Sequence, residues 1–566
     1  MMPIFSYLRR RWIWDLGLLA LVTVVVNSRM IFDGLNGVAD LQWHVTWLQH
    51  FARGMEEGNL YPRWLGGTNF GYGSPTFMFY PPLVYYLGTA LKTLGLSTEQ
   101  AIVLLFCLGI FGCGAVMYGY QRSRTQQNSL PALGGAIAYM SAPYLSYMVY
   151  NFGSLSTLIA MIWLPYLWWM GDRAVEGKGW PWQLSLGWAL LAFTHVPSLL
   201  LGAVVWVPYM LWRCRRRGKR LLSMLTCMGL GLGLASIFLV PAVIENAWVD
   251  VNAMATVGGA TFYARMIRFH HLWTTRINFD SHLNWAFFYQ LLCSVALALI
   301  ALALSWRQGK ERAMVLRWLS LLLLLAIAMT TLTWPLWQLS ATLLRVQSPT
   351  RLLSFFSMAG GALLSLALAQ SWRPQRRWWI RVAVTALAVV LLMGNLAYAY
   401  KWSRRSPAIH NPGRADISYL DGFKEALYNP YQGTLPDVPE YRPLIDGQPP
   451  PAPEPGEDRV SVLSGQAAVQ IQAWRSQTRA LQIEAATPAQ IKIRTFAYPA
   501  WQLQVNNQPQ PIEVLADGAI AFDLPAGTHS ATLTFGTTRA VWIGSILSMI
   551  CAAISAGAIA LKTVFH

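Results

Sequence analysis

Long apolar runs recur along the chain and constrain its fold more than any other feature. At 1.5 Å per residue, a helix of about 20 residues crosses the hydrocarbon core of a bilayer. Only 12% of the 566 residues are charged, against about 25% in an ordinary soluble domain. We therefore predict an all-α polytopic membrane bundle of about twelve transmembrane helices. The candidate spans lie near residues 12–32, 100–121, 130–150, 153–172, 180–196, 198–213, 221–243, 286–306, 314–334, 353–371, 380–400 and 540–562.

Basic residues cluster in the short loops between these runs, and they set the predicted orientation. Loops rich in Lys and Arg remain on the cytoplasmic side. Arg9-Arg10-Arg11 precede the first run, which we interpret as a retained helix with a cytoplasmic N-terminus. The net charge of +18 is distributed over many loops rather than one continuous face, which argues against nucleic-acid binding. The loops placed inside contain Arg122/Arg124, Arg173/Lys178, Arg213 to Arg220, Arg307/Lys310/Arg312 and Arg373/Arg376/Arg377.

Four longer segments then face outward and contain most of the polar residues. They are 33–99, 244–285, 335–352 and 401–539. Within the first of them, the apolar stretch 79–96 is short and is interrupted by Pro81-Pro82. If this stretch crossed the membrane, the basic loop 213–217 would face outward, against the charge rule. We therefore predict that 79–96 is interfacial or re-entrant.

The segment 401–539 differs from the rest of the chain. After a Pro-rich stretch from Pro449 to Pro455, short alternating runs are separated by turn signals such as Asn506-Asn507 and Asp517-Gly518. This spacing predicts a small β-sandwich. The expected domains are a multi-span membrane domain (1–400), an extracytoplasmic linker with the β-sandwich (401–539) and a final transmembrane helix (540–566). The expected strands are 468–473, 480–485, 491–496, 501–505, 519–522 and 530–535.

The first external loop contains the leading catalytic candidates. A helix from about Asp40 to Glu56 would place Asp40 and His44 one turn apart on the same face. A carboxylate at this position can accept a proton from an incoming hydroxyl or bind a divalent cation. The alternatives are that Asp40 only caps the helix and that His44 only packs against Trp43 and Trp47.

An arginine pair lies in the third external segment. Arg351 follows Pro349 at the outer end of the span 353–371, and Arg345 lies six residues earlier. A guanidinium at the outer interface can bind a lipid phosphate through paired hydrogen bonds. The alternative is an arginine that snorkels at a helix end.

Three further residues are candidates for a substrate pocket. Glu245 ends an apolar span at the outer face, where a carboxylate is costly unless it has a function. His195 lies in a tight external turn, and His270 lies in the basic, aromatic loop 244–285. The alternatives are a solvated helix end, a turn residue bonded to backbone, and contact with anionic lipid headgroups. His270 and His271 are adjacent and would diverge on a helix, which does not suit a shared metal.

Several motifs, in order along the chain, resemble one bacterial membrane family. Asp40–x3–His44 is followed by Gly58-Asn-Leu-Tyr-Pro-Arg-Trp64, by Gly71-Tyr-Gly-Ser-Pro75 and by Phe79-Tyr80-Pro-Pro-Leu83. This order resembles the 6-pyruvoyl-tetrahydropterin-synthase-related membrane proteins, which belong to the C-type glycosyltransferase superfamily. The remaining matches are Thr194-His-Val-Pro197, Leu239-Val-Pro-Ala-Val-Ile-Glu245, Val346-Gln-Ser-Pro-Thr-Arg351, Tyr498-Pro-Ala-Trp501 and Leu524-Pro-Ala-Gly-Thr-His529.

The resemblance implies an enzyme of the bacterial inner membrane that works at the outer face. Such enzymes transfer a sugar, with inversion, from a polyprenyl-phosphate donor to a hydroxyl of a glycan, lipid or protein acceptor. It implies that Asp40 is the catalytic carboxylate. We expect His44 to act beside it, Arg351 and Arg345 to bind the donor phosphate, and Glu245, His195, Tyr80 and His270 to line the pocket. Many members have a second acidic residue close by in the first loop, which this chain lacks. A divalent cation, magnesium or manganese, is therefore an open expectation, with Asp40 as its ligand.

Two other functions remain open. A transporter or flippase of lipid-linked saccharides would also need many spans, and it would place paired polar groups along a path through the bilayer. A non-enzymatic envelope assembly factor would use the β-domain as a binding module, and it would tolerate replacement of Asp40 and Arg351.

Overall fold

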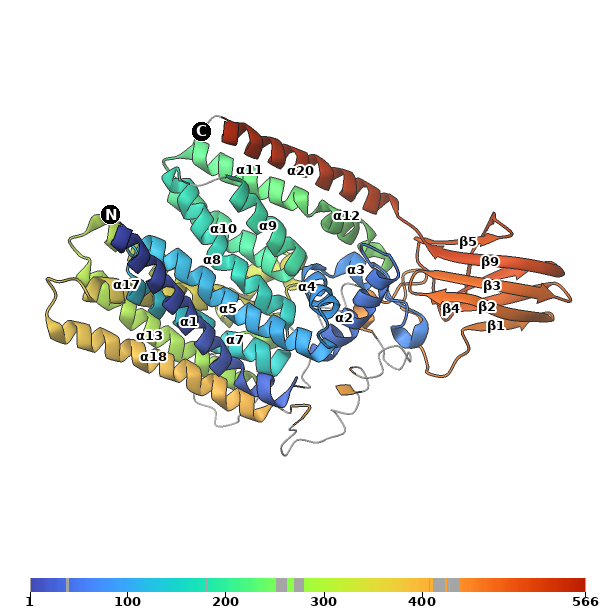
Figure 1. Ribbon diagram of the computed structural model, residues 1–566, viewed down its shortest axis with the longest axis horizontal. Helices are drawn as coiled ribbons and strands as arrows, with labels where there is room; N and C mark the ends of the chain where they lie inside the picture. The colour runs from blue at the N-terminus through green and yellow to red at the C-terminus, as the bar shows by residue number, and fades with distance from the viewer. Residues whose placement is uncertain are drawn as a thin grey trace. The chain divides into compact units, whose positions relative to one another are not determined.

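The computed structural model describes residues 2–36, 40–178, 181–250, 262–268, 279–406, 408–410, 423–424, 427 and 437–564. The chain forms two compact units. The first contains Met1–Leu41, Ile102–Gly229 and Ala255–Asp416, and the second contains Gln42–Ala101, Leu230–Met254 and Ile417–His566. Helices and strands are labelled in Figure 1.

The first unit is a bundle of helices organised around α17. Eighteen of the nineteen residues of α17 are buried, and it packs against α6, α13 and α14. The contact with α6 is close because glycines face each other: a Cβ at Gly135 would lie 2.6 Å from the carbonyl oxygen of Gly361. Small residues allow such backbone approach between helices in membranes. The longer helices of or entering this unit are α1 (Met2–Asp33), α5 (Thr98–Arg124), α6 (Ser129–Met140), α8 (Leu155–Glu176), α9 (Pro181–Thr194), α10 (Val196–Cys214), α11 (Gly218–Leu234), α13 (Phe279–Leu304), α14 (Gly309–Ala328), α17 (Leu353–Ser371) and α18 (Trp378–Arg405).

Seven helices among the described residues are long and apolar enough to cross a membrane, or eight if one bent pair forms a single span. The mostly helical, multi-span character predicted from the sequence is confirmed, whereas the number twelve is not. The bent pair is α11 with α12, which meet at an angle of 75°. The seven are Trp12–Asp33, Thr98–Arg124, Val196–Cys214, Leu283–Leu304, Pro349–Ser371, Trp378–Arg405 and Arg539–Ala560.

The predicted span 130–150 is not one continuous helix. It is divided into α6, α7 (Pro143–Tyr147) and the π-turn η2 (Met148–Phe152). A proline at position 143 disfavours helical geometry at the residue before it, and Ala142 is extended with ψ 142°. The π-turn ends at Gly153, which is left-handed with φ 63°, so that the chain reverses into α8.

Short helices complete the first unit. They are α15 (Trp334–Gln338), α16 (Ala341–Leu344) and the 3-10 turns η5 (Tyr263–Arg265), η7 (Thr331–Thr333) and η8 (Pro349–Leu352).

The helical part of the second unit begins with α2 (Leu41–Glu56), which lies one residue from the predicted start. The predicted interfacial stretch 79–96 contains α4 (Leu83–Thr93). At 1.5 Å per residue, its eleven residues extend about 16 Å, too short to cross a bilayer. The other helical elements are η1 (Asn69–Gly71), α3 (Thr76–Phe79), α12 (Ser236–Ile244), η3 (Glu245–Trp248), η9 (Pro439–Tyr441) and α20 (Arg539–Val564).

The predicted β-domain is confirmed as two antiparallel sheets within the second unit. One has the order β1-β4-β8-β7 and the other β2-β3-β9-β5-β6. Both predicted turns contain left-handed residues, with φ 62° at Asn507 and 84° at Gly518. Buried residues alternate along β5, as expected for a strand with one face in the core. The strands are β1 (Val460–Ser464), β2 (Ala467–Arg475), β3 (Thr478–Ala485), β4 (Ala489–Phe496), β5 (Trp501–Val505), β6 (Gln508–Gln510), β7 (Glu513–Val514), β8 (Ala519–Leu524) and β9 (Gly527–Phe535).

The final helix, α20, packs along α12 (Figure 1). The contact is tight, because a Cβ at Gly544 would lie 2.4 Å from the carbonyl oxygen of Ser236. The hydroxyl of Ser548 accepts a hydrogen bond from the amide of Ile237 (2.8 Å) and donates to the carbonyl of Leu234 (3.0 Å). These backbone groups lie at the break between α11 and α12, where the regular helical bonds are interrupted. One serine of α20 therefore satisfies polar groups that the bend exposes.

Candidate active site

Asp40 lies directly before α2, against the π-turn that leads into α8. Its amide donates to the carbonyl of Phe152 at 2.9 Å. Its carboxylate accepts a hydrogen bond from the side chain of Ser154. Single π-turns occur often at functional sites, and here the π-turn and the left-handed Gly153 bring Ser154 to the carboxylate.

The surroundings of Asp40 favour its protonated form more than water does. Burial raises the pKa of Asp40 to about 6, although Arg351, the hydrogen bond from Ser154 and Arg265 each act to lower it. A base works best when its pKa lies near the operating pH. The carboxylate can therefore accept a proton near neutral pH and still be ionised there.

Arg351 is held by two neutral acceptors. One terminal nitrogen contacts Nε2 of His195 at 3.1 Å, and the other donates to Oε1 of Gln347 at 2.6 Å. Among the residues that the structure describes, no carboxylate lies within ion-pair distance of Arg351. Its positive charge nevertheless acts to lower the pKa of Asp40. The two acceptors thus fix the orientation of the guanidinium without neutralising its positive charge.

His195 holds Arg351 from the N-terminus of α10, where it is the N-cap. A guanidinium only donates hydrogen bonds, so Nε2 of His195 accepts from Arg351 and the ring is neutral in this arrangement. Ser198 contacts the other nitrogen, Nδ1, at 2.8 Å, and the hydroxyl of Thr157 lies 3.3 Å from Nε2. His195 is buried, with 6% of its surface exposed. The structure therefore makes His195 a buried hydrogen-bond partner of Arg351.

The arginine that shares a hydrogen-bond acceptor residue with Arg351 is Arg265, and the predicted role of Arg345 stays a prediction. Arg265 donates to the backbone carbonyl of Gln347 at 3.2 Å, and its positive charge acts to lower the pKa of Asp40. Arg345 is exposed. The sequence showed Arg265 only as one of several cations in an external loop.

Two of the predicted site residues, His44 and Tyr80, lie in an aromatic cluster of the second unit. Nδ1 of His44 contacts the hydroxyl of Tyr85 at 2.7 Å, and its ring stacks on the Tyr85 ring. Burial lowers the pKa of His44 to about 3, so it is neutral at physiological pH. Tyr80 packs on Trp47 with ring centres 4.6 Å apart. His270 lies outside the described residues.

Glu245 connects two parts of the second unit. Its Oε2 accepts a hydrogen bond from the hydroxyl of Tyr498 at 2.5 Å, and its Oε1 accepts one from the hydroxyl of Thr538. Tyr498 follows β4, and Thr538 directly precedes α20. Both carboxylate oxygens of this buried side chain are occupied, so the structure gives Glu245 a link to the β-domain and its return helix.

The residues around Asp40 do not fit a magnesium or manganese site. These hard cations prefer about six oxygen ligands, supplied by one or two carboxylates together with waters and substrate phosphates. The described neighbours of Asp40 instead supply one hydroxyl, from Ser154, and two guanidiniums, from Arg351 and Arg265. Within the described ranges, no three His, Cys, Asp or Glu residues are grouped as metal ligands.

Sequence reasoning missed three neighbours of the predicted residues: Ser154, Thr157 and Gln347. Ser154 directly precedes α8, and Thr157 lies in the first turn of this helix. Gln347 lies within the motif that identified Arg351. Neither location indicated which side chains would meet.

No protein-family model matches the sequence, and no curated protein matches it either. Among solved structures, the arabinofuranosyltransferase AftD from Mycobacteria is similar over 72% of this chain, at 14% identity and a TM-score of 0.46. The chain spans only 27% of the length of AftD. ArnT from Cupriavidus metallidurans, bound to undecaprenyl phosphate, is similar over 76% of this chain and 90% of its own, at 15% identity and a TM-score of 0.30. Such low TM-scores do not establish a common fold.

Proposed function

We propose that the protein is an integral membrane glycosyltransferase that uses a polyprenyl-phosphate sugar as donor and works at the extracytoplasmic face of the bacterial inner membrane. The observation that supports this most is that two groups occur at one site. The first is the carboxylate of Asp40, whose pKa is raised to about 6. The second is the guanidinium of Arg351, which has no ion-pair partner in the described part of the chain. A base and an anion-binding group at one site are what glycosyl transfer from a phosphate requires.

In the proposed reaction, an acceptor hydroxyl attacks the anomeric carbon of the donor. A bond forms between the acceptor oxygen and this carbon while the bond from the carbon to the phosphate oxygen breaks. The hydroxyl proton passes to the carboxylate of Asp40. The electron pair of the broken bond remains on the polyprenyl phosphate, where Arg351 and Arg265 stabilise the developing charge. Attack from the side opposite the phosphate would invert the anomeric configuration.

The other predicted residues take supporting roles in this proposal. His195 and Gln347 orient Arg351 through the contacts described above. Ser154 orients the carboxylate of Asp40. The β-domain would guide a glycan, lipid or protein acceptor, and Glu245 would keep this domain attached to α20. No step passes through a metal ion, because the residues do not fit one.

The test uses the protein in lipid nanodiscs with a panel of polyprenyl-phosphate sugars and candidate acceptors, and it measures release of free polyprenyl phosphate. Wild type should release it, and Asp40→Asn should not. Asp33→Asn is the matched control, because this carboxylate lies on the same segment and pairs with Arg29 (2.7 Å). Equal release by wild type and Asp40→Asn would refute the role of Asp40. If no donor is turned over with any acceptor, the enzyme assignment fails and a flipping assay would follow.

A further inference from the structure

Gln347 has an unusual backbone at the centre of the site. Its φ is 70°, in the left-handed region that a non-glycine residue adopts only with backbone strain. Its amide still donates to the carbonyl of Leu344 at 3.0 Å, which closes the turn after α16. Strained residues of this kind persist where the surrounding structure holds them in place.

In this conformation, one residue supplies acceptors to two guanidiniums. The backbone carbonyl of Gln347 accepts from Arg265 at 3.2 Å. Its side-chain oxygen accepts from Arg351 at 2.6 Å. The two arginines are 86 positions apart in the sequence, as 351 minus 265 gives, and Gln347 bridges them.

The backbone of Arg265 is fixed independently of Gln347. The neighbouring Ile267 forms a parallel bridge with Thr330, through hydrogen bonds of 2.9 and 3.3 Å to the adjacent residues. The ring of Tyr263 packs on Trp334 with centres 5.4 Å apart. Arg351 is fixed in turn by η8 and by His195. The bridge therefore joins two rigid elements and sets the distance between their charges.

The neutrality of Gln347 matters as much as its position. Two guanidiniums repel each other, and a carboxylate between them would cancel both the repulsion and the attraction for an anion. The backbone carbonyl and the side-chain amide of Gln347 hold the two groups without adding a negative charge between them. The positive charges of both arginines act to lower the pKa of Asp40.

We infer that Gln347 is a positioning residue that holds Arg265 and Arg351 as a two-guanidinium clamp for the phosphate monoester of the polyprenyl donor. Two arginines can share the oxygens of one phosphate group through charge-assisted hydrogen bonds. The clamp rests on the proposed function, since it assigns the donor phosphate to that same site.

The test measures binding of a short-chain polyprenyl phosphate to the protein in phosphatidylcholine nanodiscs, before any transfer assay. Gln347→Glu keeps the size of the side chain and adds a charge, and it should weaken binding about 10- to 100-fold. Gln347→Gly relieves the left-handed strain, keeps the backbone carbonyl that accepts from Arg265 and removes the side-chain amide that accepts from Arg351. This variant should weaken binding about fivefold. Gln338→Glu, at the exposed end of α15, is the control for added charge and should bind like wild type. Size-exclusion profiles establish that each variant is folded.

Two further ligands separate the sources of the phosphate. Inorganic phosphate and nanodiscs containing phosphatidylglycerol should compete weakly, because neither presents a polyprenyl monoester. Equal competition by either would overturn the assignment to the donor. In steady state, Gln347→Gly should raise the KM for the donor and leave the KM for the acceptor unchanged, whereas damage to the fold would alter both.

The outcomes for the clamp and for the proposed function differ. If wild type does not bind polyprenyl phosphate at all, both are refuted. If wild type binds it and Gln347→Glu binds equally well, the clamp alone is refuted. The glycosyltransferase proposal would then depend on the Asp40→Asn result.

Discussion

Helices α8 and α10 bear polar clusters at both ends, and the two clusters are built in opposite ways. At their N-terminal ends, Thr157 and His195 stand beside Arg351, whose partners are neutral. At their C-terminal ends, Asp172 and Arg213 form an ion pair at 2.8 Å. About 22 Å of α8 separates Thr157 from Asp172 at 1.5 Å per residue.

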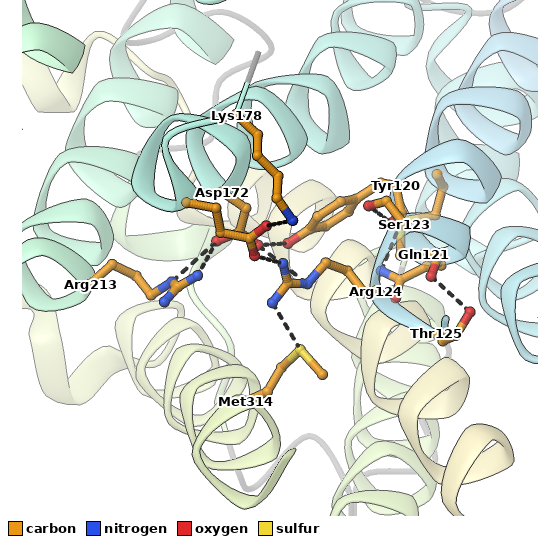
Figure 2. A network of polar contacts seen from close by, with 11 residues as sticks. Tyr120, Gln121, Ser123, Arg124, Thr125, Asp172, Lys178, Arg213 and Met314 are labelled. Carbon is orange, nitrogen blue, oxygen red and sulfur yellow. Dashed lines mark hydrogen bonds and ion pairs between the residues drawn. The ribbon is translucent and has the colours of Figure 1, made fainter. Parts of the chain in front are cut away.

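The C-terminal cluster has its charges paired (Figure 2). Asp172 accepts two hydrogen bonds from Arg213 and one from the hydroxyl of Tyr120 at 2.8 Å. Arg124 at the end of α5 pairs with Glu176 at 2.5 Å and lies 3.8 Å from Asp172. Three helix ends are thereby joined through one buried carboxylate, Asp172, and one exposed carboxylate, Glu176.

The paired cluster stabilises the helices, whereas the cluster at the N-terminal ends is arranged to bind an anion. Breaking a buried ion pair leaves an uncompensated charge, so the paired end holds the helices in register. The other end retains a raised pKa at Asp40 and an arginine with neutral partners, which is less favourable for folding and more useful for binding an anion. The same two helices can serve both purposes because the clusters are far apart.

Exchanging a carboxylate for an amide at each end should give the largest and most opposite effects. Asp40→Asn should lower kcat/KM by about 10³-fold or more, with a thermal midpoint equal to or above that of wild type, because a buried ionised carboxylate is lost. Asp172→Asn should lower the free energy of unfolding by about 3–5 kcal/mol and leave the activity per folded molecule near wild type. Thermal unfolding and transfer assays in nanodiscs measure both. Similar profiles for the two variants would remove the distinction.

Replacing an arginine by lysine at each end should sharpen the contrast further. Lysine provides a single point charge and cannot donate to two separate acceptors in the same plane. Arg351→Lys should therefore raise the donor KM about 10- to 100-fold. Arg213→Lys should change the donor KM less than about twofold and lower the thermal midpoint instead. A donor KM that responds equally to both would mean that Arg351 does not contact the donor.

The pH dependence should report on Asp40. Burial raises its pKa from 3.8 to about 6, and a general base must be deprotonated. The value of kcat/KM should therefore be constant above roughly pH 7 and fall about tenfold per unit below pH 6. Folding stability should change in the opposite sense, because the folded state binds this proton more tightly than the unfolded chain does. If kcat/KM began to fall only below pH 5, a group other than Asp40 would be responsible for its pH dependence.

The smallest expected effect concerns metal ions. Because the neighbours of Asp40 include two guanidiniums, EDTA should change the transfer rate by less than about twofold, and added magnesium should not raise it. Purified protein passed over a chelating resin provides the comparison. A rate that vanishes with EDTA and returns with magnesium would contradict this site description.

The sequence predicted those features that depend on residues near one another in the chain. The strand β5 begins and ends where it was expected, since Trp501 and Val505 alternate with polar residues before Asn506. The helix after Asp40 and the final helix were also placed within two residues. The break within 130–150 was missed, because its apolar composition conceals the effect of Pro143.

Features that depend on distant contacts could not be predicted in this way. The sequence places Arg345 near Arg351 because the two are close along the chain, and it gives no sign that Gln347 bonds to both Arg265 and Arg351. Glu245 was assigned to a pocket because a boundary carboxylate requires an explanation. The structure gives it a hydrogen bond from Tyr498, 253 positions away, and no local pattern reveals such a partner. Its role in a pocket stays a prediction.

The contact of Ser548 with the broken helix has a consequence for the order in which the protein is made. A ribosome produces α11 and α12 some 300 residues before α20. Until Ser548 emerges, the amide of Ile237 lacks the acceptor that it has in the finished protein. An unsatisfied backbone group in a membrane costs several kcal/mol, so a chain that stops before α20 would retain a defect in its middle. A stable second unit therefore depends on α20, whose Ser548 supplies this acceptor.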